Sequence, residues 1–369
     1  MKVIQLLPEL NSGGVERGTL DVSNHLGRLG HESVVLSNGG RMVELVHAGG
    51  GRSIQLPIHL KRPSALLLIP QLRRIFRDER PDLVHARSRL PAWLTWLAWS
   101  GLDRRTRPRF LTTFHGFYSV NAYSRIMTRG ERVIAVSESI RDFMMRRFGL
   151  PSERIVVIHR GVDPEQFRRG YSPSSDWLAK WRAEHPYLEG EHLLLLPGRL
   201  TRMKGQEDLV DLIASLRRRG IPAHGMMVGE IVEAKRRFVD ELKQCARDRG
   251  VGEFIHLTGH RADVRDIMSV SRIVLSLSRD PEAFGRVSLE ALSLGRPVIA
   301  TDHGGVAEQM RLIEPRGLVP CGSPEELLRR TIEFLESPPS PGPIPAQFTL
   351  SHMLDSTMGV YDSLMRAGR

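Results

Sequence analysis

The sequence predicts an α/β protein made of two Rossmann-like, doubly wound domains. Short apolar runs alternate with helix-length amphipathic segments, which indicates parallel sheets covered by helices. The alternation lapses once, in a polar, proline-bearing stretch from Arg168 to Glu191, and then restarts. The length of 369 residues also suits two domains. We therefore expect a first domain over 1–168, a second over 169–350, and a final helix over 351–369 that can pack back on the first domain.

The first domain begins with a βαβ pattern. An apolar strand over Lys2–Leu7 leads to a glycine-bearing turn at 11–14, a helical pattern over Val15–Leu29, and a second strand over Ser33–Ser37. Since a helix between two strands implies that the strands are parallel, the sheet should be parallel. Further strands of this domain are expected at Leu83–His85, Phe110–Phe114, Val133–Val136 and Ile155–Ile158.

The second domain repeats the same alternation. Its strands are expected at Leu193–Leu196, Gly225–Val228, Ile255–Leu257, Ile273–Leu277 and Val298–Ala300. Ligands of such sheets bind beyond the carboxyl ends of the strands, and here we also expect binding in the cleft between the domains.

Composition excludes several classes of protein. Two cysteines, Cys245 and Cys321, exclude a disulfide scaffold, and no run reaches the 18 apolar residues that a membrane span needs. The apolar run at Met1–Leu7 is broken by Pro8 and Glu9, so no secretory signal is expected. We expect a cytoplasmic protein that can lie on the inner face of the cytoplasmic membrane.

The excess positive charge lies in the first half. Residues 1–170 contain 27 Lys and Arg against 15 Asp and Glu, whereas residues 171–369 contain 26 against 27. This asymmetry favours an anionic partner for the first domain. Solvated arginines in an arginine-rich chain are the alternative, because 47 of the 53 basic residues are Arg.

The segment from Glu282 to Glu290 is typical of an anion site. Gly285 allows close approach of a ligand to the backbone, and Val287 and Ser288 would offer free amides in the first turn of a helix. A diphosphate suits such a helix end. The two carboxylates on either side could each hold a pair of hydroxyls, one pair from a ribose and one from a hexose.

This segment resembles the Glu-x7-Glu signature of the retaining nucleotide-sugar glycosyltransferases usually numbered family four, which have two Rossmann-like domains in the GT-B arrangement. The resemblance runs along most of the chain, through an ordered set of motifs: Gly13–Arg17, Leu29–Glu32, Pro81–Arg87, Val136–Ser137, Gly161–Asp163, Gly198–Leu200, Lys204–Gly205 and Gly304–Gly305 with Glu308. It implies hexose transfer from a nucleotide-diphosphate sugar, with UDP-glucose or UDP-N-acetylglucosamine favoured over GDP-mannose.

The resemblance implies a role for each matching residue. Arg199 and Lys204 would pair with the donor diphosphate, and Glu290 would hold the ribose. Glu282, with the backbone of Ala283, Phe284 and Gly285, would hold the donor sugar. Gly13 and Gly14 would let a loop of the first domain approach the phosphates or the acceptor, and His115 matches a histidine that contacts the donor sugar near the reacting carbon. No cofactor is implied, and because no Asp-x-Asp occurs, we expect no metal at the diphosphate.

Two positions depart from the family pattern. Ala283 replaces a glycine, which preserves the turn only if this residue keeps a negative φ. Arg160 replaces an asparagine, and there it could touch an anionic acceptor.

The acceptor is expected to be an anionic glycan or glycolipid, and among family members the sequence looks most like bacterial enzymes of the lipopolysaccharide core. Arg104, Arg105, Arg107 and Arg109 follow three tryptophans spaced along one helix face, Trp93, Trp96 and Trp99. Such a surface could dock on an anionic bilayer, or the tryptophans could belong to the core.

Other functions stay open at this stage. A nucleotide-sugar epimerase uses a similar fold, and a non-catalytic protein that binds anionic glycans or membranes would share the basic half. No recognised motif supports nucleic-acid binding, and the first turn lacks the G-x-G-x-x-G of nicotinamide dehydrogenases.

Overall fold

The computed structural model describes residues 1–11, 13–230 and 236–367, and it has the α/β class predicted from the sequence. Its chain forms two compact units. The first is Met1–Arg160 together with the segment that begins at Leu350, and the second is Gly161–Thr349. The stretch after Arg160 belongs to the second unit because Val162 forms a bridge with Thr349 and the carbonyl of Phe167 accepts a hydrogen bond from Ser293.

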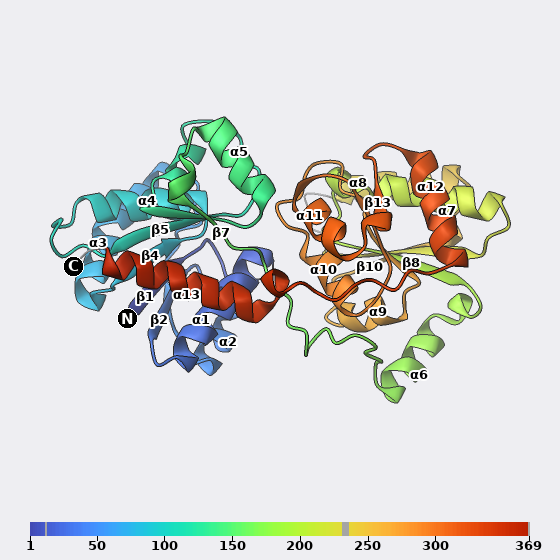
Figure 1. Ribbon diagram of the computed structural model, residues 1–369, viewed down its shortest axis with the longest axis horizontal. Helices are drawn as coiled ribbons and strands as arrows, with labels where there is room; N and C mark the ends of the chain where they lie inside the picture. The colour runs from blue at the N-terminus through green and yellow to red at the C-terminus, as the bar shows by residue number, and fades with distance from the viewer. Residues whose placement is uncertain (12, 231–235, 368–369) are drawn as a thin grey trace. The chain divides into compact units, whose positions relative to one another are not determined.

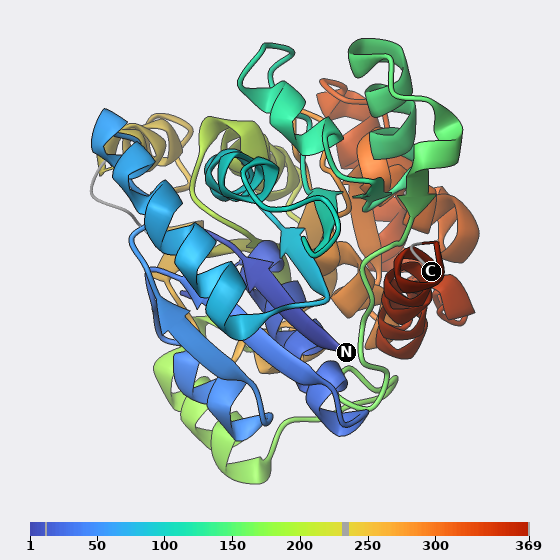
Figure 2. The same cartoon turned by 90° about the vertical axis from the view of Figure 1, so that its left-hand side faces the viewer.

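The first unit contains a seven-stranded parallel sheet in the order β3-β2-β1-β4-β5-β6-β7 (Figure 2). Its strands are β1 (Lys2–Leu6), β2 (Glu32–Ser37), β3 (Arg52–Gln55), β4 (Leu83–Ala86), β5 (Arg109–Phe114), β6 (Arg132–Ala135) and β7 (Ile155–Val157). All but β3 were predicted. The strand β3 lies at an edge and is only partly buried, so its sequence lacks the continuous apolar run of the inner strands.

Helices follow most of these strands. They are α1 (Gly14–Arg28), α2 (Val43–Ala48), α3 (Leu68–Glu79), α4 (Arg89–Ser100) and α5 (Glu138–Phe148). The C-terminal helix α13 (Leu350–Arg366) belongs to the same unit, where it lies beside α1 on the sheet (Figure 1). Its apolar side chains join one core cluster with residues of α1, β1, β4, β5 and β6.

Tyr361 fixes α13 to this sheet. Its side chain is completely buried, and its hydroxyl lies 2.8 Å from Nδ1 of His85 on β4. The other ring nitrogen of His85 lies 2.6 Å from the hydroxyl of Thr113 on β5. Burial lowers the pKa of His85 well below its ordinary value, so this histidine is neutral and serves as a structural link.

The second unit contains a six-stranded parallel sheet in the order β10-β9-β8-β11-β12-β13. The strands are β8 (His192–Pro197), β9 (Ala223–Val228), β10 (Ile255–Gly259), β11 (Ile273–Ser276), β12 (Val298–Thr301) and β13 (Leu318–Val319). The sequence did not predict β13, a two-residue edge strand. The helices are α6 (Ser175–Glu184), α7 (Gln206–Arg218), α8 (Arg236–Asp248), α9 (Val264–Val270), α10 (Arg286–Ser293), α11 (Gly304–Ile313) and α12 (Pro324–Glu336).

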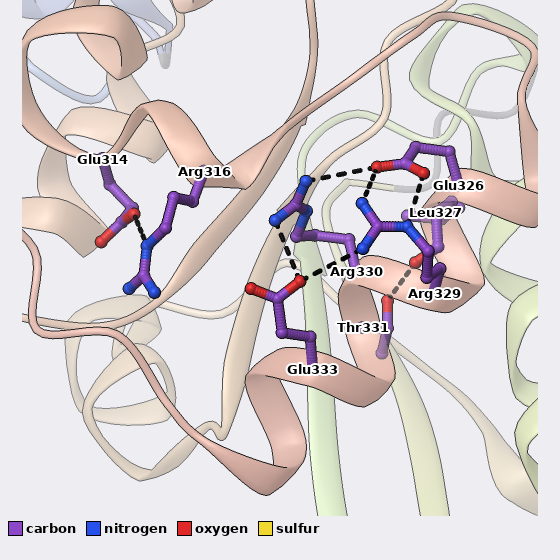
Figure 3. A network of polar contacts seen from close by, with 8 residues as sticks. All are labelled: Glu314, Arg316, Glu326, Leu327, Arg329, Arg330, Thr331 and Glu333. Carbon is purple, nitrogen blue, oxygen red and sulfur yellow. Dashed lines mark hydrogen bonds and ion pairs between the residues drawn. The ribbon is translucent and has the colours of Figure 1, made fainter.

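Basic side chains of the second unit are extensively paired. On α12, Arg329 and Arg330 both bind the carboxylates of Glu326 and Glu333, and Arg316 pairs with Glu314 nearby in the chain (Figure 3). The sequence of this unit is nearly neutral overall, and on α12 the arginines find carboxylates at helical spacings of three or four residues.

Each sheet reverses its winding direction once. In the first sheet the reversal falls between β1 and β4, and in the second between β8 and β11. Loops that leave the carboxyl ends of two such neighbouring strands run to opposite faces, which is where ligands of this architecture bind. Within the described residues, no helix is long and apolar enough to cross a bilayer.

Replacing Tyr361 by Phe should destabilise the first unit by about 1–3 kcal/mol, because Nδ1 of buried His85 then loses its partner. The free energy of unfolding can be measured by denaturant titration. Tyr123→Phe is a matched control, since Tyr123 is exposed, and it should cost less than about 0.5 kcal/mol. Equal stability of the two variants would contradict the role given to the Tyr361 hydroxyl.

Candidate active site

The second sheet brings two predicted groups together at its reversal point. Arg199 and Lys204 lie in the loop after β8, and Glu282 lies in the loop after β11, the neighbouring strand. Nζ of Lys204 lies 2.7 Å from Oε1 of Glu282. Because these two strands are adjacent, residues far apart in the sequence form a direct ion pair.

Glu282 is held as a carboxylate. Burial alone would raise its pKa, but the Lys204 ammonium, a hydrogen bond from the Ser278 hydroxyl and the nearby His303 outweigh this effect. The net pKa of Glu282 therefore lies below its ordinary value. Glu282 is ionised at neutral pH and loses its charge only in acid.

The backbone around Glu282 is also fixed. Its carbonyl accepts a hydrogen bond of 2.8 Å from the amide of Gly305 at the start of α11, and the Gln309 side chain of the same helix donates to the carbonyl of Phe284. Phe284 is buried and packs edge-on against Phe348. Ala283 keeps a negative φ, since Arg80 is the one non-glycine residue with positive φ among those described. The turn therefore accepts alanine at this position.

Gly285 connects this turn to α10. Its φ is +84°, in the left-handed region, and a Cβ atom there would lie 2.1 Å from Cγ2 of Val306. Both the conformation and the space require glycine. Val287 and Ser288 follow in the first turn of α10, and Ser288 is completely buried. Its hydroxyl has no partner among the described residues.

The side chains of Glu290 and Arg199 differ in whether they form an ion pair. On α10, the carboxylate of Glu290 lies 3.2 Å from the guanidinium of Arg286, one helical turn away. Arg199 is exposed, and no ion pair of its side chain occurs within the described part of the chain. Its carbonyl accepts a hydrogen bond from buried Gln206, which holds the loop.

Sequence reasoning missed two residues of this cluster, Ser278 and His303. Ser278 donates to Glu282, and His303, at the start of α11, contributes to the lowered pKa of Glu282. Both nitrogens of the His303 ring are buried and lack a partner in the described structure. The signal that could have found His303 is its place just before Gly304–Gly305, a pair that the family motif already marked.

In the first unit, three predicted residues follow strands β1 and β5. Gly13 precedes α1 with a φ of +141°, and Gly14 is the first residue of that helix. His115 follows β5 directly and is half-buried. The predicted residues therefore divide between the units, with Arg199, Lys204, Glu282 and the α10 residues in the second.

Two buried arginines stand near His115. Arg87, after β4, is 2% exposed and donates through Nε to the side chain of Gln5, whereas Arg160 lies 2.6 Å from Nδ1 of His115. Burial and then the charges of Arg160, Arg87 and His85 lower the pKa of His115 well below its ordinary value. Arg160 therefore binds His115 within its own unit, and the contact with an acceptor that the sequence suggested stays a prediction.

The three tryptophans of α4 are half-buried. Nε1 of Trp93 donates to the carbonyl of Tyr123, and Nε1 of Trp99 donates to that of Pro108. Arg107 stacks on the ring of Trp99, 3.6 Å from its centroid. These polar and cation–π contacts tie the indoles to the first unit.

Among the residues described, no group of three or more His, Cys, Asp or Glu side chains could hold a metal ion. Arg199 and Lys204 in the loop after β8 are two charges of the second unit that could meet a ligand diphosphate. Together with the amides at the start of α10, they are candidates to bind an anion whose hydroxyl-bearing parts could bind carboxylates.

Comparison with known proteins agrees with this chemistry. Residues 12–166 match the family model Glycosyltransferase Family 4, and residues 179–345 match Glycosyl transferases group 1. A D-inositol 3-phosphate glycosyltransferase from Catenulispora acidiphila is 26% identical over 259 residues, which are 67% of this chain and 60% of that protein. This chain therefore matches less than two thirds of that relative.

Solved structures resemble the whole chain. A glycosyltransferase from Rickettsia africae has a TM-score of 0.85 at 28% identity, covering 99% of this chain and 98% of its own. HepE from Anabaena, solved in complex with UDP and glucose, has a TM-score of 0.82 at 21% identity, with coverage of 98% and 100%. The latter likeness is one of fold.

Replacing Gly285 by Ala should destabilise the second unit, because the added methyl group meets Val306 and the backbone is strained. Gly220→Ala is the matched control, with a φ of +72° but no atom within 4 Å of its Cβ. Strain costs roughly 1–2 kcal/mol at both sites, and overpacking adds about 1–3 kcal/mol at Gly285 alone. Denaturant unfolding of both variants measures the difference, and equal losses would contradict the close packing of α10 on α11.

Proposed function

Because the chain belongs to the glycosyltransferases, with a Family 4 domain followed by a group 1 domain, we propose that it transfers a hexose from a nucleotide-diphosphate sugar to an anionic acceptor, with retention of the anomeric configuration. The observation that carries this proposal is the Lys204–Glu282 pair beside the start of α10. A cation, helix amides and an ionised carboxylate in one place suit a ligand that contains both a diphosphate and sugar hydroxyls.

The proposed reaction exchanges one bond for another at the anomeric carbon. The bond from this carbon to the diphosphate oxygen breaks, and a bond to the acceptor oxygen forms on the same face of the sugar. The acceptor proton passes to an oxygen of the departing diphosphate, so no side-chain nucleophile is needed. Negative charge grows on the diphosphate as the sugar becomes cationic, and fixed positive groups at the diphosphate stabilise this change.

Each charged group then has a distinct task. Arg199 and Lys204 would bind the diphosphate, and Glu282 would accept hydrogen bonds from the hexose hydroxyls. Lys204 would move its ammonium from Glu282 towards the phosphates, which leaves the carboxylate oxygens for the sugar. Glu290, whose carboxylate now pairs with Arg286, would bind the ribose hydroxyls.

For the donor, UDP-glucose and UDP-N-acetylglucosamine are the favoured candidates, followed by GDP-mannose. The shared fold of HepE, solved with UDP and glucose, supports a UDP-sugar. A thermal-shift comparison of UDP, GDP and ADP with their sugar conjugates tests this choice. Since no metal is part of the proposed site, stabilisation by the donor should persist in EDTA.

Lys204→Met and Glu282→Gln should each lower the rate of hexose transfer by about 10²–10³-fold, because each removes a charged group at the reacting part of the donor. Lys243→Met is the control, since Lys243 lies exposed on α8, and its rate should be unchanged. Transfer of labelled hexose from each UDP-sugar to glycolipid fractions measures the effect. Near-normal rates for folded Lys204→Met or Glu282→Gln protein would contradict the role proposed for that residue in binding the donor.

The first unit suits an anionic acceptor. Its sequence, including the C-terminal segment from Leu350, has 27 Lys and Arg against 15 Asp and Glu, whereas the second unit has 26 against 27. The acceptor named for the Catenulispora relative is also a phosphate ester, which supports a phosphorylated acceptor here. As acceptor we favour a phosphorylated glycolipid such as the lipopolysaccharide core, which the protein would bind at the cytoplasmic face of the membrane.

The basic loop after α4 contains two exposed arginines and two that contact other side chains. Arg104 and Arg105 are exposed, whereas Arg107 stacks on Trp99 and Arg109 pairs with Glu131 at 2.7 Å. Exposed leucines near the start of α3, Leu66 and Leu67, would add apolar contact with a bilayer. Of the four arginines, the first two are therefore the ones available to an anionic surface.

Reversing two charges in the variant Arg104→Glu/Arg105→Glu should weaken binding to vesicles containing anionic lipid, and added salt should reduce the difference from wild type. The variant Lys180→Glu/Arg182→Glu makes the same change of net charge on α6 of the second unit and should bind as wild type does. Cosedimentation with vesicles measures both. Identical binding by both variants would remove this loop from the membrane proposal.

A further inference from the structure

Arg160 occupies an unusual position at the end of the first unit. It is 9% exposed, and its Nη2 lies 2.6 Å from Nδ1 and 3.5 Å from Nε2 of His115. Its Nη1 lies 3.9 Å from the sulfur of Met353 on α13. The guanidinium thus contacts a sulfur and an imidazole of its own unit, and Nδ1 is the nearer of the two ring nitrogens.

A glycine in α1 makes room for this guanidinium. A Cβ atom on Gly18 would lie 2.7 Å from Nη1 of Arg160. Glycine inside a helix costs about 1 kcal/mol relative to alanine, so its presence needs a reason from packing. The close approach of Arg160 to the helix backbone supplies that reason, independently of the contact with His115.

The contact fixes the role of each His115 nitrogen. A guanidinium in a protein always carries its protons and can only donate. Nδ1 of His115 must therefore accept, and it must hold a lone pair. A neutral imidazole with a lone pair on Nδ1 carries its single hydrogen on Nε2.

We propose that Arg160 is a positioning residue that holds the His115 ring neutral with its hydrogen on Nε2, so that His115 donates a hydrogen bond to the transferred hexose and does not act as a base. The inference about the ring stands on the geometry of the first unit alone. The part that concerns the hexose rests on the proposed function.

The groups around His115 also favour the neutral form of its ring. The charged and titratable groups around it are Arg160, Arg87, His85 and Tyr118, whose hydroxyl accepts a long hydrogen bond of 3.4 Å from the His115 amide. Burial, followed by the two guanidiniums, lowers the pKa of His115, and His85 is itself neutral. Among these groups none is a carboxylate that would favour the protonated ring.

A neutral histidine suits the proposed chemistry. The sugar gains positive charge as its bond to the diphosphate breaks, and an imidazolium beside it would oppose that change. A neutral Nε2–H can bind a sugar oxygen without adding a full charge. Arg160 would thereby set both the charge and the direction of the His115 hydrogen bond.

The direct test is the nitrogen spectrum of the histidine rings in the full-length protein. Long-range ¹H–¹⁵N correlation distinguishes a protonated from an unprotonated ring nitrogen, and loss of one signal set in His115→Gln assigns His115 among the 14 histidines. We expect Nε2 to be protonated and Nδ1 unprotonated, with the pKa of this ring well below its ordinary value. A proton on Nδ1, or titration near 6.5 in the wild-type protein, would overturn the proposal.

Two substitutions test the cause. Arg160→Met should mix the two neutral tautomers and raise the pKa of His115 towards 6.5, and Gly18→Ala should do so in part by displacing Arg160. Gly359→Ala in α13 is the matched control, because it also lies in a helix of this unit but nothing lies within 4 Å of its Cβ. It should leave the His115 signals unchanged. Unchanged signals in folded Arg160→Met protein would assign the tautomer to some other group and overturn the role of Arg160.

Ligand affinity tests the part that concerns the hexose. His115→Gln and Arg160→Met should weaken binding of UDP-glucose or UDP-N-acetylglucosamine roughly three- to tenfold relative to UDP, which is the effect of about one hydrogen bond. An unchanged ratio with intact UDP binding would overturn the contact between His115 and the hexose. If the protein binds no UDP compound, the UDP donor of the proposed function fails instead, and the spectra still decide the role of Arg160.

Discussion

The ion pair between Lys204 and Glu282 depends on the winding of the second sheet. The strands β8 and β11 are neighbours although β9 and β10 come between them in the sequence, and the sheet reverses direction at this point. The loops after both strands therefore begin side by side, and each supplies one partner of the pair. The position of α10, with Gly285 at its start, and the contact of the Glu282 backbone with α11 follow from the same loop.

The first unit differs in that it buries several cationic and polar side chains. Arg87, Arg160, His85 and His115 lie at or near the carboxyl ends of β4, β5 and β7, where strands that are otherwise apolar would tolerate no unpaired charge. The structure places acceptors there: Gln5 for Arg87, and the ring of His115 for Arg160. The C-terminal helix takes part, because Tyr361 binds His85 and Met353 lies beside Arg160. Removal of this helix would expose the network to water.

The two units contain nearly equal numbers of basic residues, but the first has fewer carboxylates. In the second unit, many arginines pair with carboxylates, either within one helix, as on α12, or between distant segments, as Arg279 does with Asp208. In the first unit, some cations stack on aromatic rings or bind backbone carbonyls, and others such as Arg104 and Arg105 stay exposed. The surplus of charge therefore resides on the surface of the first unit, and it supports the proposal of a negatively charged acceptor.

Local sequence was sufficient to predict most of the fold. Parallel strands buried on both faces are short apolar runs, so 11 of the 13 strands in the described residues could be predicted. The polar edge strand β3 and the two-residue β13 could not. The order of the motifs likewise predicted a glycosyltransferase, which is confirmed, and placed Glu282 and Glu290 beside a helix start. The local sequence pattern could not predict the direction in which each side chain points. Tertiary structure decided the pairing of Glu290 with Arg286 and the contact of Arg160 with His115. It also decided which arginines after α4 bind other side chains, as Arg107 and Arg109 do, and which stay exposed, as Arg104 and Arg105 do. Partners distant in the sequence meet only when the sheet order and the packing of α1 and α13 bring them together.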